Sequence, residues 1–363
     1  MITERFTCRV CGGPFDPLLN LGTPVLSDFL HPDAPDPPRV PLDLVVCQRC
    51  DLVQLRHTVD PEKLYRQYWY RSGVNEAMRA ELADVARTVR TYVPRGTVLD
   101  VGANDGTLLL NFPGESWNRI GVEPAKNIQP LVSASCWFND FFPTATQGIP
   151  RESIDAITSV ACFYDLDDPL SFVAEVDRLL TPDGVWVCQF QDLLQQVQTN
   201  AFDNIVVEHL CYYSARTFQD LLNDFNLSIV DGETRPINGG SLRFVVRRSE
   251  YTKIPVSWIG VQTVLEDRLL SRDALDQFAW RVGEYKVQLL AAIDRVLSQD
   301  LYLDLYAAST KSSTLLQYCG IDASRIRWAV ERSLEKWGLV TSGSRIPIIS
   351  EEDWRVDPAP VTL

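Results

Sequence analysis

Four cysteines near the N-terminus have a spacing that could hold a metal ion. They form two Cys-x-x-Cys pairs, Cys8 with Cys11 and Cys47 with Cys50. Zinc prefers four soft ligands in a tetrahedron, and four thiolates leave no coordination position open for water or substrate. The spacing therefore predicts a structural zinc site. Two disulfides or plain buried thiols are the alternatives, and a redox role is disfavoured because neither pair opens a helix after a strand.

A second group of residues has the pattern of a nucleotide-like cofactor site. An apolar strand at residues 98–101 runs into a turn with Gly102 and Gly106, which let the backbone bend sharply and approach a ligand closely. A helix expected at residues 107–110 would then offer free N–H groups. The next strand ends at Glu123, about 20 residues on, where a carboxylate can accept both hydroxyls of a ribose.

Two later segments extend this pattern. Asp140 beside Phe141 offers an acid and an aromatic ring, which suit the edge and the face of an adenine. Residues 180–184 (Leu-Thr-Pro-Asp-Gly) form a turn that is usual in class I methyltransferases. The succession resembles the Rossmann-like α/β fold of class I enzymes that bind S-adenosylmethionine. The expected cofactor residues are Asp100, Gly102, Asn104, Gly106, Glu123, Asp140 and Phe141.

Two alternatives to this cofactor site stay open. Asp100 and Glu123 could be mere caps at strand ends. An NAD enzyme uses a similar turn, but a third glycine is missing here and the turn at 180–184 also counts against it.

The hydrophobic pattern divides the chain into four segments. Residues 1–60 combine the paired cysteines with many prolines, which predicts a small metal-held unit. Residues 61–95 end in an amphipathic helix. Residues 96–250 alternate strands with helices, as in a mostly parallel sheet covered on both faces. Residues 251–363 are expected to form a second, smaller α/β domain. The apolar stripe of the amphipathic helix comprises Met78, Leu82, Val85, Val89 and Tyr92.

The last segment carries its own sequence of predicted elements. One long helix is expected from residue 261 to about 298. A strand at 301–306, a Ser/Thr-rich turn and a helix around 315–318 follow it. This strand-turn-helix order is the reason for expecting an α/β domain there.

The composition is that of an ordinary globular protein. The chain has 363 residues, 45% of them hydrophobic and 23% charged, which is enough for two or three domains. The formal net charge of -14 disfavours a nucleic-acid partner, because such proteins carry basic surfaces. No apolar run approaches the roughly 18 residues that span a bilayer, and residues 1–5 have no apolar signal region behind them. We therefore expect a cytoplasmic monomer with reduced thiols that acts on small molecules, without a membrane or nucleic acid.

Six strings of residues spread over nearly the whole chain are distinctive. They are CRVCG at 8–12, VCQRCDLVQL at 46–55, YWYRSG at 68–73, EHLCYYS at 208–214, INGGSLR at 237–243 and ASTK at 308–311. In this order they resemble the zinc-containing sugar C-methyltransferases that act on nucleotide-linked 4-keto sugars. The resemblance implies a zinc-bearing N-terminal domain, a central S-adenosylmethionine domain and a C-terminal domain that helps hold a nucleotide sugar.

The resemblance also implies a set of catalytic residues. In that family a proton is lost next to a ketone, giving an enolate whose carbon takes the methyl group, so a base near neutral pH is needed. Of the three histidines, His209 lies in the matching string, beside Glu208, which could orient the imidazole. Tyr70, with Tyr212 or the neighbouring Tyr213, could bond the sugar oxygens. A buried histidine satisfied by Glu208, and tyrosines that only fill the core, are the alternatives.

The chain departs from the family pattern before the Glu-His pair and at the C-terminal turn. Val206 and Val207 stand where the family has a tyrosine and a histidine, and Ala307 and Ser312 stand where it has glycines. Three functions therefore stay open: C-methylation of a nucleotide-linked 4-keto sugar, O- or N-methylation of another small molecule with His209 as base, and cofactor binding without turnover. The two valines and the altered turn favour the second.

Overall fold

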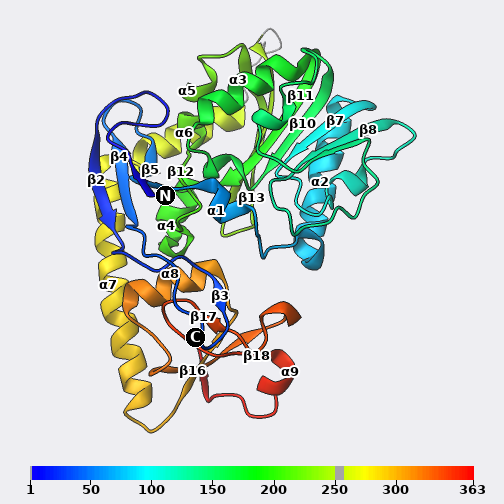
Figure 1. Cartoon of the computed structure of the whole chain (residues 1–363). Helices are drawn as coiled ribbons and strands as arrows, with labels where there is room; N and C mark the ends of the chain where they lie inside the picture. The colour runs from blue at the N-terminus through cyan, green and yellow to red at the C-terminus, as the bar shows by residue number, and fades with distance from the viewer. Residues whose placement is uncertain (1, 250–256) are drawn as a thin grey trace.

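The computed structural model describes residues 2–249 and 257–363. A seven-stranded sheet forms the centre, a cysteine-bearing unit lies to one side of it, and a smaller sheet from the last part of the chain lies below (Figure 1). The domain boundary expected between residues 250 and 251 lies outside the described residues.

Seven strands make up the central sheet: β7 (Gly96–Val101), β8 (Trp117–Val122), β9 (Cys136–Phe138), β10 (Ile154–Val160), β11 (Leu180–Gln191), β13 (Leu227–Arg235) and β14 (Ser241–Arg248). Their order is β13-β14-β11-β10-β7-β8-β9. The strands from β11 to β9 in this order are parallel, and β13 and β14 form an antiparallel hairpin at one edge. The prediction of a mostly parallel sheet is confirmed.

Helices cover both faces of this sheet, also as predicted. They are α2 (Glu76–Tyr92) on one face, and α3 (Pro169–Leu179) and α5 (Ala215–Leu222) on the other. The apolar stripe of α2 packs against strands β7, β10, β11 and β14. Asn75 starts α2, because its side-chain oxygen accepts hydrogen bonds from the first free N–H groups. On the opposite face, Phe172 and Phe218 pack around the buried Trp186.

Two connections differ from the sequence prediction. Residues 107–110 do not form the expected helix, and a single 3-10 turn, Leu109–Asn111, follows the glycine turn. Pro113 explains this, because the residue before a proline is disfavoured in the helical conformation. The turn predicted at 180–184 lies within the bounds of β11, where the register with β10 jumps from Ile154–Leu180 to Ala156–Val185. The turn is therefore a bulge in a strand.

The N-terminal unit is joined to both other parts of the chain by strand pairing. Its strands are β1 (Ile2–Glu4), β2 (Phe15–Asn20), β3 (Phe29–Leu30), β4 (Asp43–Cys47), β5 (Val53–Leu55) and β6 (His57–Val59), followed by helix α1 (Pro61–Tyr65). The sheet β2-β4-β5 is completed by β12 (Cys211–Tyr212), which comes from the central part of the chain. Strand β3 pairs with β17 (Val340–Thr341), from the C-terminal part.

The C-terminal unit is a small parallel α/β domain, as predicted. Its elements are β15 (Leu303–Tyr306), α8 (Thr310–Cys319), β16 (Ile326–Glu331), β18 (Ile348–Ser350), α9 (Glu351–Trp354) and β19 (Val361–Thr362). The sheet order is β18-β16-β15-β19, and all neighbours are parallel.

The long helix expected from residue 261 to 298 is two helices. They are α6 (Ser257–Leu269) and α7 (Arg272–Leu297). Ser271 separates them, because its side chain accepts a hydrogen bond from the Ala274 N–H and so starts α7 as a new helix. Helix α7 runs from beside the upper part of the molecule down to the C-terminal sheet (Figure 1).

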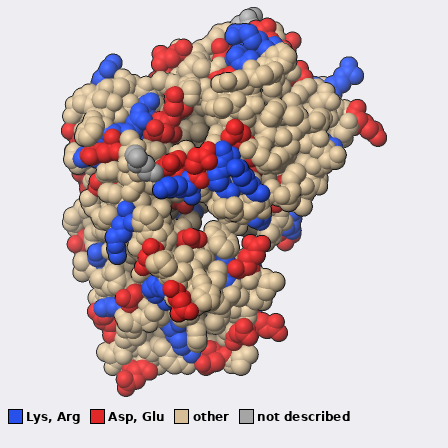
Figure 2. All heavy atoms as spheres, viewed as in Figure 1, with Lys and Arg blue, Asp and Glu red and all other residues tan. Residues whose placement is uncertain are grey.

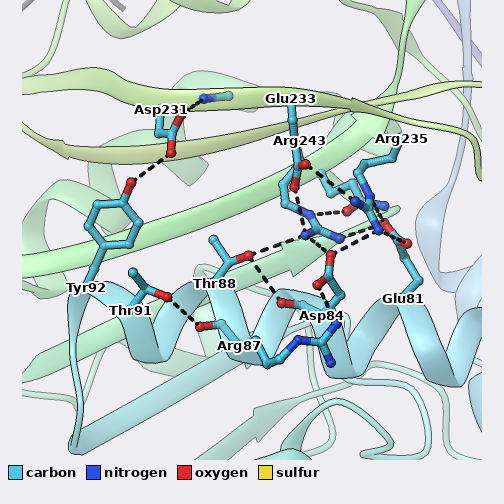
Figure 3. Close-up of polar contacts among 12 residues, drawn as sticks. Glu81, Asp84, Arg87, Thr88, Thr91, Tyr92, Asp231, Glu233, Arg235 and Arg243 are labelled. Carbon is cyan, nitrogen blue, oxygen red and sulfur yellow. Dashed lines mark hydrogen bonds and ion pairs between the residues drawn. The ribbon is translucent and has the colours of Figure 1, made fainter.

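A buried ionic network fastens α2 to the hairpin β13-β14 (Figure 3). Its centre is Arg243, which is 1% exposed. The guanidinium contacts Glu81 at 2.6 Å, Asp84 at 2.7 Å and Glu233 at 3.1 Å. Its Nε–H also donates to the side chain of Gln189 at 2.8 Å. These three ion pairs join residues of α2 and β13 to one side chain of β14, so the helix is held in one position against the sheet.

Removing this arginine is expected to destabilise the protein strongly. Arg243→Met removes the buried cation of the network and leaves only the more exposed Arg235 and Arg87 to balance Glu81, Asp84 and Glu233, so the free energy of unfolding should fall by about 3 kcal/mol. Urea unfolding followed by circular dichroism measures it. The matched control is Arg87→Met: Arg87 pairs with the same Asp84 at 2.6 Å but is 61% exposed, so less than about 1 kcal/mol is expected. Equal losses in the two variants would refute the structural role given to Arg243.

Charges of both signs are interspersed on the face shown in Figure 2, which is hollowed where the upper and lower parts of the molecule meet. Within the described part of the chain, no helix combines the length and the apolar character needed to cross a bilayer.

Candidate functional site

The four paired cysteines come together in one cluster. Their sulfur atoms all lie within 4.8 Å of one another, with 3.6 Å between Cys8 and Cys50 and 3.4 Å between Cys11 and Cys47. No disulfide joins them. Four thiolates placed tetrahedrally at about 2.3 Å from a zinc ion would lie about 3.8 Å apart. The donor set and the spacing therefore fit a structural zinc ion.

Arg9, inside the first cysteine pair, links this cluster to the rest of the protein. The side chain is buried and donates to Gln54, to the Leu55 carbonyl, to Thr58 at 2.8 Å and to Asp167 at 3.2 Å. Thr58 and Asp167 line the large cavity described next. The metal cluster is thus connected to the cavity wall through one side chain.

A cavity of about 490 Å³ lies at the carboxyl ends of β7, β8 and β10. This edge is where ligands bind in parallel α/β sheets. Its walls come from all three parts of the chain. The N-terminal part supplies Thr58, Tyr65 and Tyr68, the central sheet supplies the glycine turn and the His209 segment, and the C-terminal part supplies Thr310 and Lys311.

The glycine turn forms one end of the cavity. Gly102 has a φ of +71°, and a Cβ there would lie 3.1 Å from the Cβ of Cys162, so a glycine is required. Gly102 and Asn104 line the cavity. Gly106, with a φ of +78°, does not line it; a Cβ there would lie 2.7 Å from Val132, so this glycine serves packing of the turn.

Two carboxyl groups line the cavity beside this turn. Burial raises the pKa of Asp100 to about 7, although its side chain accepts a hydrogen bond from Thr158 at 2.7 Å. Burial also raises the pKa of Glu123, whose oxygens accept from the N–H groups of Asn104 at 2.7 Å and Ala125 at 2.8 Å. These two bonds hold the Glu123 carboxylate at the end of β8, with lone pairs left for a ligand.

Asp140 and Phe141 follow β9 as predicted, but only Phe141 lines the cavity. The carboxylate of Asp140 forms an ion pair with Arg66 at 2.9 Å. The same guanidinium lies 4.5 Å from the centre of the Phe141 ring. In its predicted role at an adenine edge, the Asp140 carboxylate would also have to keep its ion pair with Arg66. The sequence gives no signal for this long-range contact.

A segment from the N-terminal side closes over the glycine turn. The N–H of Ser72 donates to the Asn104 side chain at 3.0 Å, and that side chain donates to the Tyr70 carbonyl at 3.1 Å. The N–H of Gly73 donates to Asp105 at 2.8 Å. Tyr70 is thereby placed along the cavity, and burial raises the pKa of its phenol to about 12.

His209 also lines the cavity. Its Nδ1 lies 3.0 Å from the Asn204 carbonyl oxygen. Because a carbonyl only accepts, Nδ1 carries the proton and Nε2 keeps a free lone pair. Burial lowers the pKa of the imidazole to about 4, against the Asn204 bond, which raises it. The ring is therefore neutral at pH 7 and able to accept a proton.

Two expectations about the neighbours of His209 are wrong. The imidazole is oriented by the Asn204 carbonyl, and within the described ranges no hydrogen bond or ion pair joins it to Glu208. Glu208 does line the cavity, and burial raises its pKa to about 6. Tyr212, on β12, and the adjacent Tyr213 are both buried in the core and do not line the cavity.

At the C-terminal turn, Ala307 and Ser312 stand in place of the two glycines of the family pattern. Ala307 stands where glycine was expected and has a φ of +92°, a conformation that strains a residue with a Cβ. Ser312 and Ser309 cap the start of α8 reciprocally. Lys311 still reaches the cavity, where its ammonium donates to the Asn238 carbonyl at 3.3 Å.

Sequence reasoning missed several cavity residues. Tyr65, Tyr68, Tyr164 and Asp165 line the cavity near His209. Tyr68 lies in one of the distinctive strings, so that string was a usable signal. Asp165 lies in an apolar stretch after β10, and only the folded structure places it at the site.

Three family models match successive parts of the chain. Residues 8–65 match a model described as "Putative zinc binding domain", residues 70–231 match "Methyltransferase domain", and residues 236–362 match "C-methyltransferase C-terminal domain". The chain is an S-adenosylmethionine-dependent C-methyltransferase. The three parts of this S-adenosylmethionine-dependent C-methyltransferase correspond to the cysteine-bearing unit, the central sheet and the C-terminal α/β domain.

Several known proteins are similar to this C-methyltransferase. A relative from Streptomyces niveus, the C-methyltransferase NovU, is 28% identical over 95% of this chain and 86% of its own length. A solved SAM-dependent methyltransferase from Leishmania major is 15% identical, with a TM-score of 0.39 over 48% of this chain and 75% of that one. A Burkholderia thailandensis N1-methyltransferase is 13% identical, with a TM-score of 0.37 over 54% of this chain and 95% of that one.

Replacing Glu123 is expected to weaken binding of S-adenosylmethionine. Loss of a charged acceptor of hydrogen bonds costs about 1.5–3 kcal/mol, so Glu123→Ala should raise Kd about 10- to 100-fold. Isothermal titration calorimetry measures this, with circular dichroism to show that the variant is folded. The exposed Glu115 provides the control, because Glu115→Ala should bind as the wild type does. Wild-type affinity in Glu123→Ala would remove Glu123 from the cofactor site.

Proposed function

We propose that this enzyme methylates a carbon next to the ketone of a nucleotide-linked 4-keto sugar. The observation that carries the proposal is the neutral His209, whose free Nε2 shares one cavity with the glycine turn and Glu123. A base within the same enclosed space as the methyl donor is what enolate formation followed by C-methylation needs. The similarity to the sugar C-methyltransferases supplies the substrate class.

The residues of the cavity have separate tasks in this proposal. Bound S-adenosylmethionine supplies the electrophilic methyl group. Glu123, Gly102 and Asn104 hold the cofactor, with Phe141 against its base. His209 accepts the proton from the substrate carbon through Nε2, while the Asn204 carbonyl keeps the ring in the required tautomer. Asn104 and Glu123 are buried, which strengthens their electrostatic effect on a bound ligand.

The nucleotide part of the substrate is assigned to the side of the cavity built by the C-terminal domain. Thr310 and Lys311 reach the cavity from the start of α8. A lysine ammonium and the free N–H groups of a helix start both favour phosphate oxygens. Lys311 has a lowered pKa because of burial, and a bound diphosphate would offset that burial.

A panel of substrates tests the proposal. The enzyme is incubated with S-adenosylmethionine carrying a radiolabelled methyl group and with dTDP- and GDP-linked 4-keto sugars. Label is expected on a sugar carbon, located by NMR of the product. Label on an oxygen or nitrogen of another acceptor would favour O- or N-methylation of another small molecule, the function that the apolar Val206 and Val207 support. Tight cofactor binding without transfer to any acceptor would favour the non-catalytic alternative.

A further inference from the structure

Asp165 lies at the His209 end of the cavity and has no role in the chemistry described so far. It ends the 3-10 turn Phe163–Asp165, which follows β10. This turn is fastened to the His209 segment, because the N–H of Leu210 donates to the Tyr164 carbonyl at 2.8 Å. The Tyr164 and His209 rings also meet edge to face, with centroids 4.4 Å apart. Asp165 and His209 are thus presented to the cavity from two adjoining segments.

The Asp165 carboxyl group is in a position that disfavours a negative charge. Its Oδ1 is buried without a hydrogen-bond partner, and so is Oε2 of Glu208. No ion pair joins either carboxyl to a lysine, arginine or histidine within residues 2–249 and 257–363. A buried carboxylate without donors or a counter-charge is costly, and two neighbouring carboxyl groups rarely ionise together.

The titration of the two groups follows from this environment. Burial first, and the nearby Glu208 charge second, raise the pKa of Asp165 well above its usual range. Burial raises the pKa of Glu208 only to about 6. Glu208 is therefore the more readily ionised of the two carboxyl groups, and Asp165 is the one whose surroundings favour the protonated form. A neutral carboxylic acid has an O–H group to donate, and the cavity that it lines holds the substrate.

The tyrosines that line this end of the cavity are Tyr65, Tyr68 and Tyr164. The Tyr65 hydroxyl donates to the Glu208 carbonyl at 3.2 Å. Tyr212 does not line the cavity. An enolate oxygen formed beside His209 needs a hydrogen-bond donor, and Asp165 is placed to provide one from the same part of the cavity as the hydroxyls of Tyr68 and Tyr164.

We propose that Asp165 is a catalytic residue that remains protonated and donates a hydrogen bond to the substrate oxygen that becomes the enolate. This inference rests on the proposed function, because only a ketone substrate forms an enolate. When the C–H bond breaks, its proton moves to Nε2 of His209 and its electron pair enters the new C=C bond. The negative charge then lies on the oxygen that Asp165 contacts. Asp165 keeps its own proton throughout, and the ketone returns when the carbon takes the methyl group.

Two substitutions of Asp165 separate a neutral donor from a charged group. Asp165→Leu removes the O–H donor, and loss of one such donor typically lowers kcat about 10²–10³-fold. Asp165→Asn cannot ionise but keeps an N–H donor, so its kcat should be at least about tenfold higher than that of the leucine variant. KM should change little in both. Asp33, 95% exposed at its side chain, provides the surface control Asp33→Leu.

The readout is exchange of the substrate's acidic proton, followed separately from methyl transfer. Each enzyme is incubated in D2O with S-adenosylhomocysteine and a 4-keto sugar that the wild type methylates, and deuterium next to the ketone is measured by NMR. Slow exchange in Asp165→Leu with recovery in Asp165→Asn is the expected result. Calorimetric binding of S-adenosylhomocysteine shows that each variant is folded.

The outcomes distinguish this inference from the proposed function. Wild-type exchange in Asp165→Leu, or an Asp165→Asn enzyme as slow as the leucine variant, would overturn the role of Asp165 alone. A wild-type enzyme that neither exchanges nor methylates any keto sugar would overturn the proposed function, and the role of Asp165 with it.

Discussion

Replacing His209 by asparagine is expected to lower kcat by about 10²–10⁴-fold and to leave KM nearly unchanged. The reason is that a general base contributes about this much to proton transfer. Asparagine keeps the approximate size of the ring and an N–H that can reach the Asn204 carbonyl, but offers no basic nitrogen. Steady-state kinetics with a 4-keto sugar measures the effect, and deuterium exchange should fall in parallel.

Two further variants make this result specific. His31 is 72% exposed at its side chain, so His31→Asn should keep wild-type kinetics. Glu208, with a pKa of about 6, is the other ionisable group that could take the proton. If His209 is the base, its pKa of about 4 leaves the imidazole neutral at higher pH. A plot of kcat against pH should then show no titration of a histidine between about pH 5.5 and 8. A transition near pH 6 that disappears in Glu208→Gln, with His209→Asn fully active, would move the role to Glu208.

Replacing Cys47 by serine is expected to release the metal and unfold the N-terminal unit. Structural zinc contributes about 10–16 kcal/mol of binding free energy in small zinc units, and the folding of such units depends on it. Metal analysis should find one zinc ion per wild-type chain and none in the variant. Limited proteolysis should then cut within residues 1–60, and substrate KM should rise because Arg9 no longer holds Thr58 and Asp167 at the cavity wall.

Cys136 provides the control for this prediction. It is a partly buried free thiol on β9, outside the metal cluster. Cys136→Ser should therefore keep its zinc and its resistance to protease. Wild-type protein purified without chelators that contains no zinc would contradict the metal assignment.

Local patterns predicted most of the framework. The strands of the central sheet, the stripe of α2 and the metal cluster depend on periodicity or spacing within short stretches, and each is present. The helix predicted at 107–110 is absent, because Pro113 disfavours the helical conformation at the residue before it and so leaves little room for a helix after the glycine turn. The break at Ser271 was missed because a serine within a helical pattern is ambiguous until its side chain is seen to cap the next helix.

The parts of the site that could not be predicted depend on contacts between distant segments. The Arg66–Asp140 ion pair joins residues on different parts of the fold. Tyr212 lies in the buried core on β12, whose partner β5 is far away in the chain. Asp165 looks like a loop residue until the turn after β10 is placed against the His209 segment. A sequence pattern names residue types, whereas burial and partner choice are properties of the assembled fold.

The pairing of β3 with β17 has a consequence for how the protein is made. These strands join residues 29–30 to residues 340–341, so residues 29–30 leave the ribosome long before the strand that pairs with them has been synthesised. The edge strand β5 likewise lacks its partner β12 until residue 212 has been synthesised. Contacts so distant in sequence form late in folding. The cavity, whose walls come from all three parts, is therefore completed only after Thr310 and Lys311 have been synthesised.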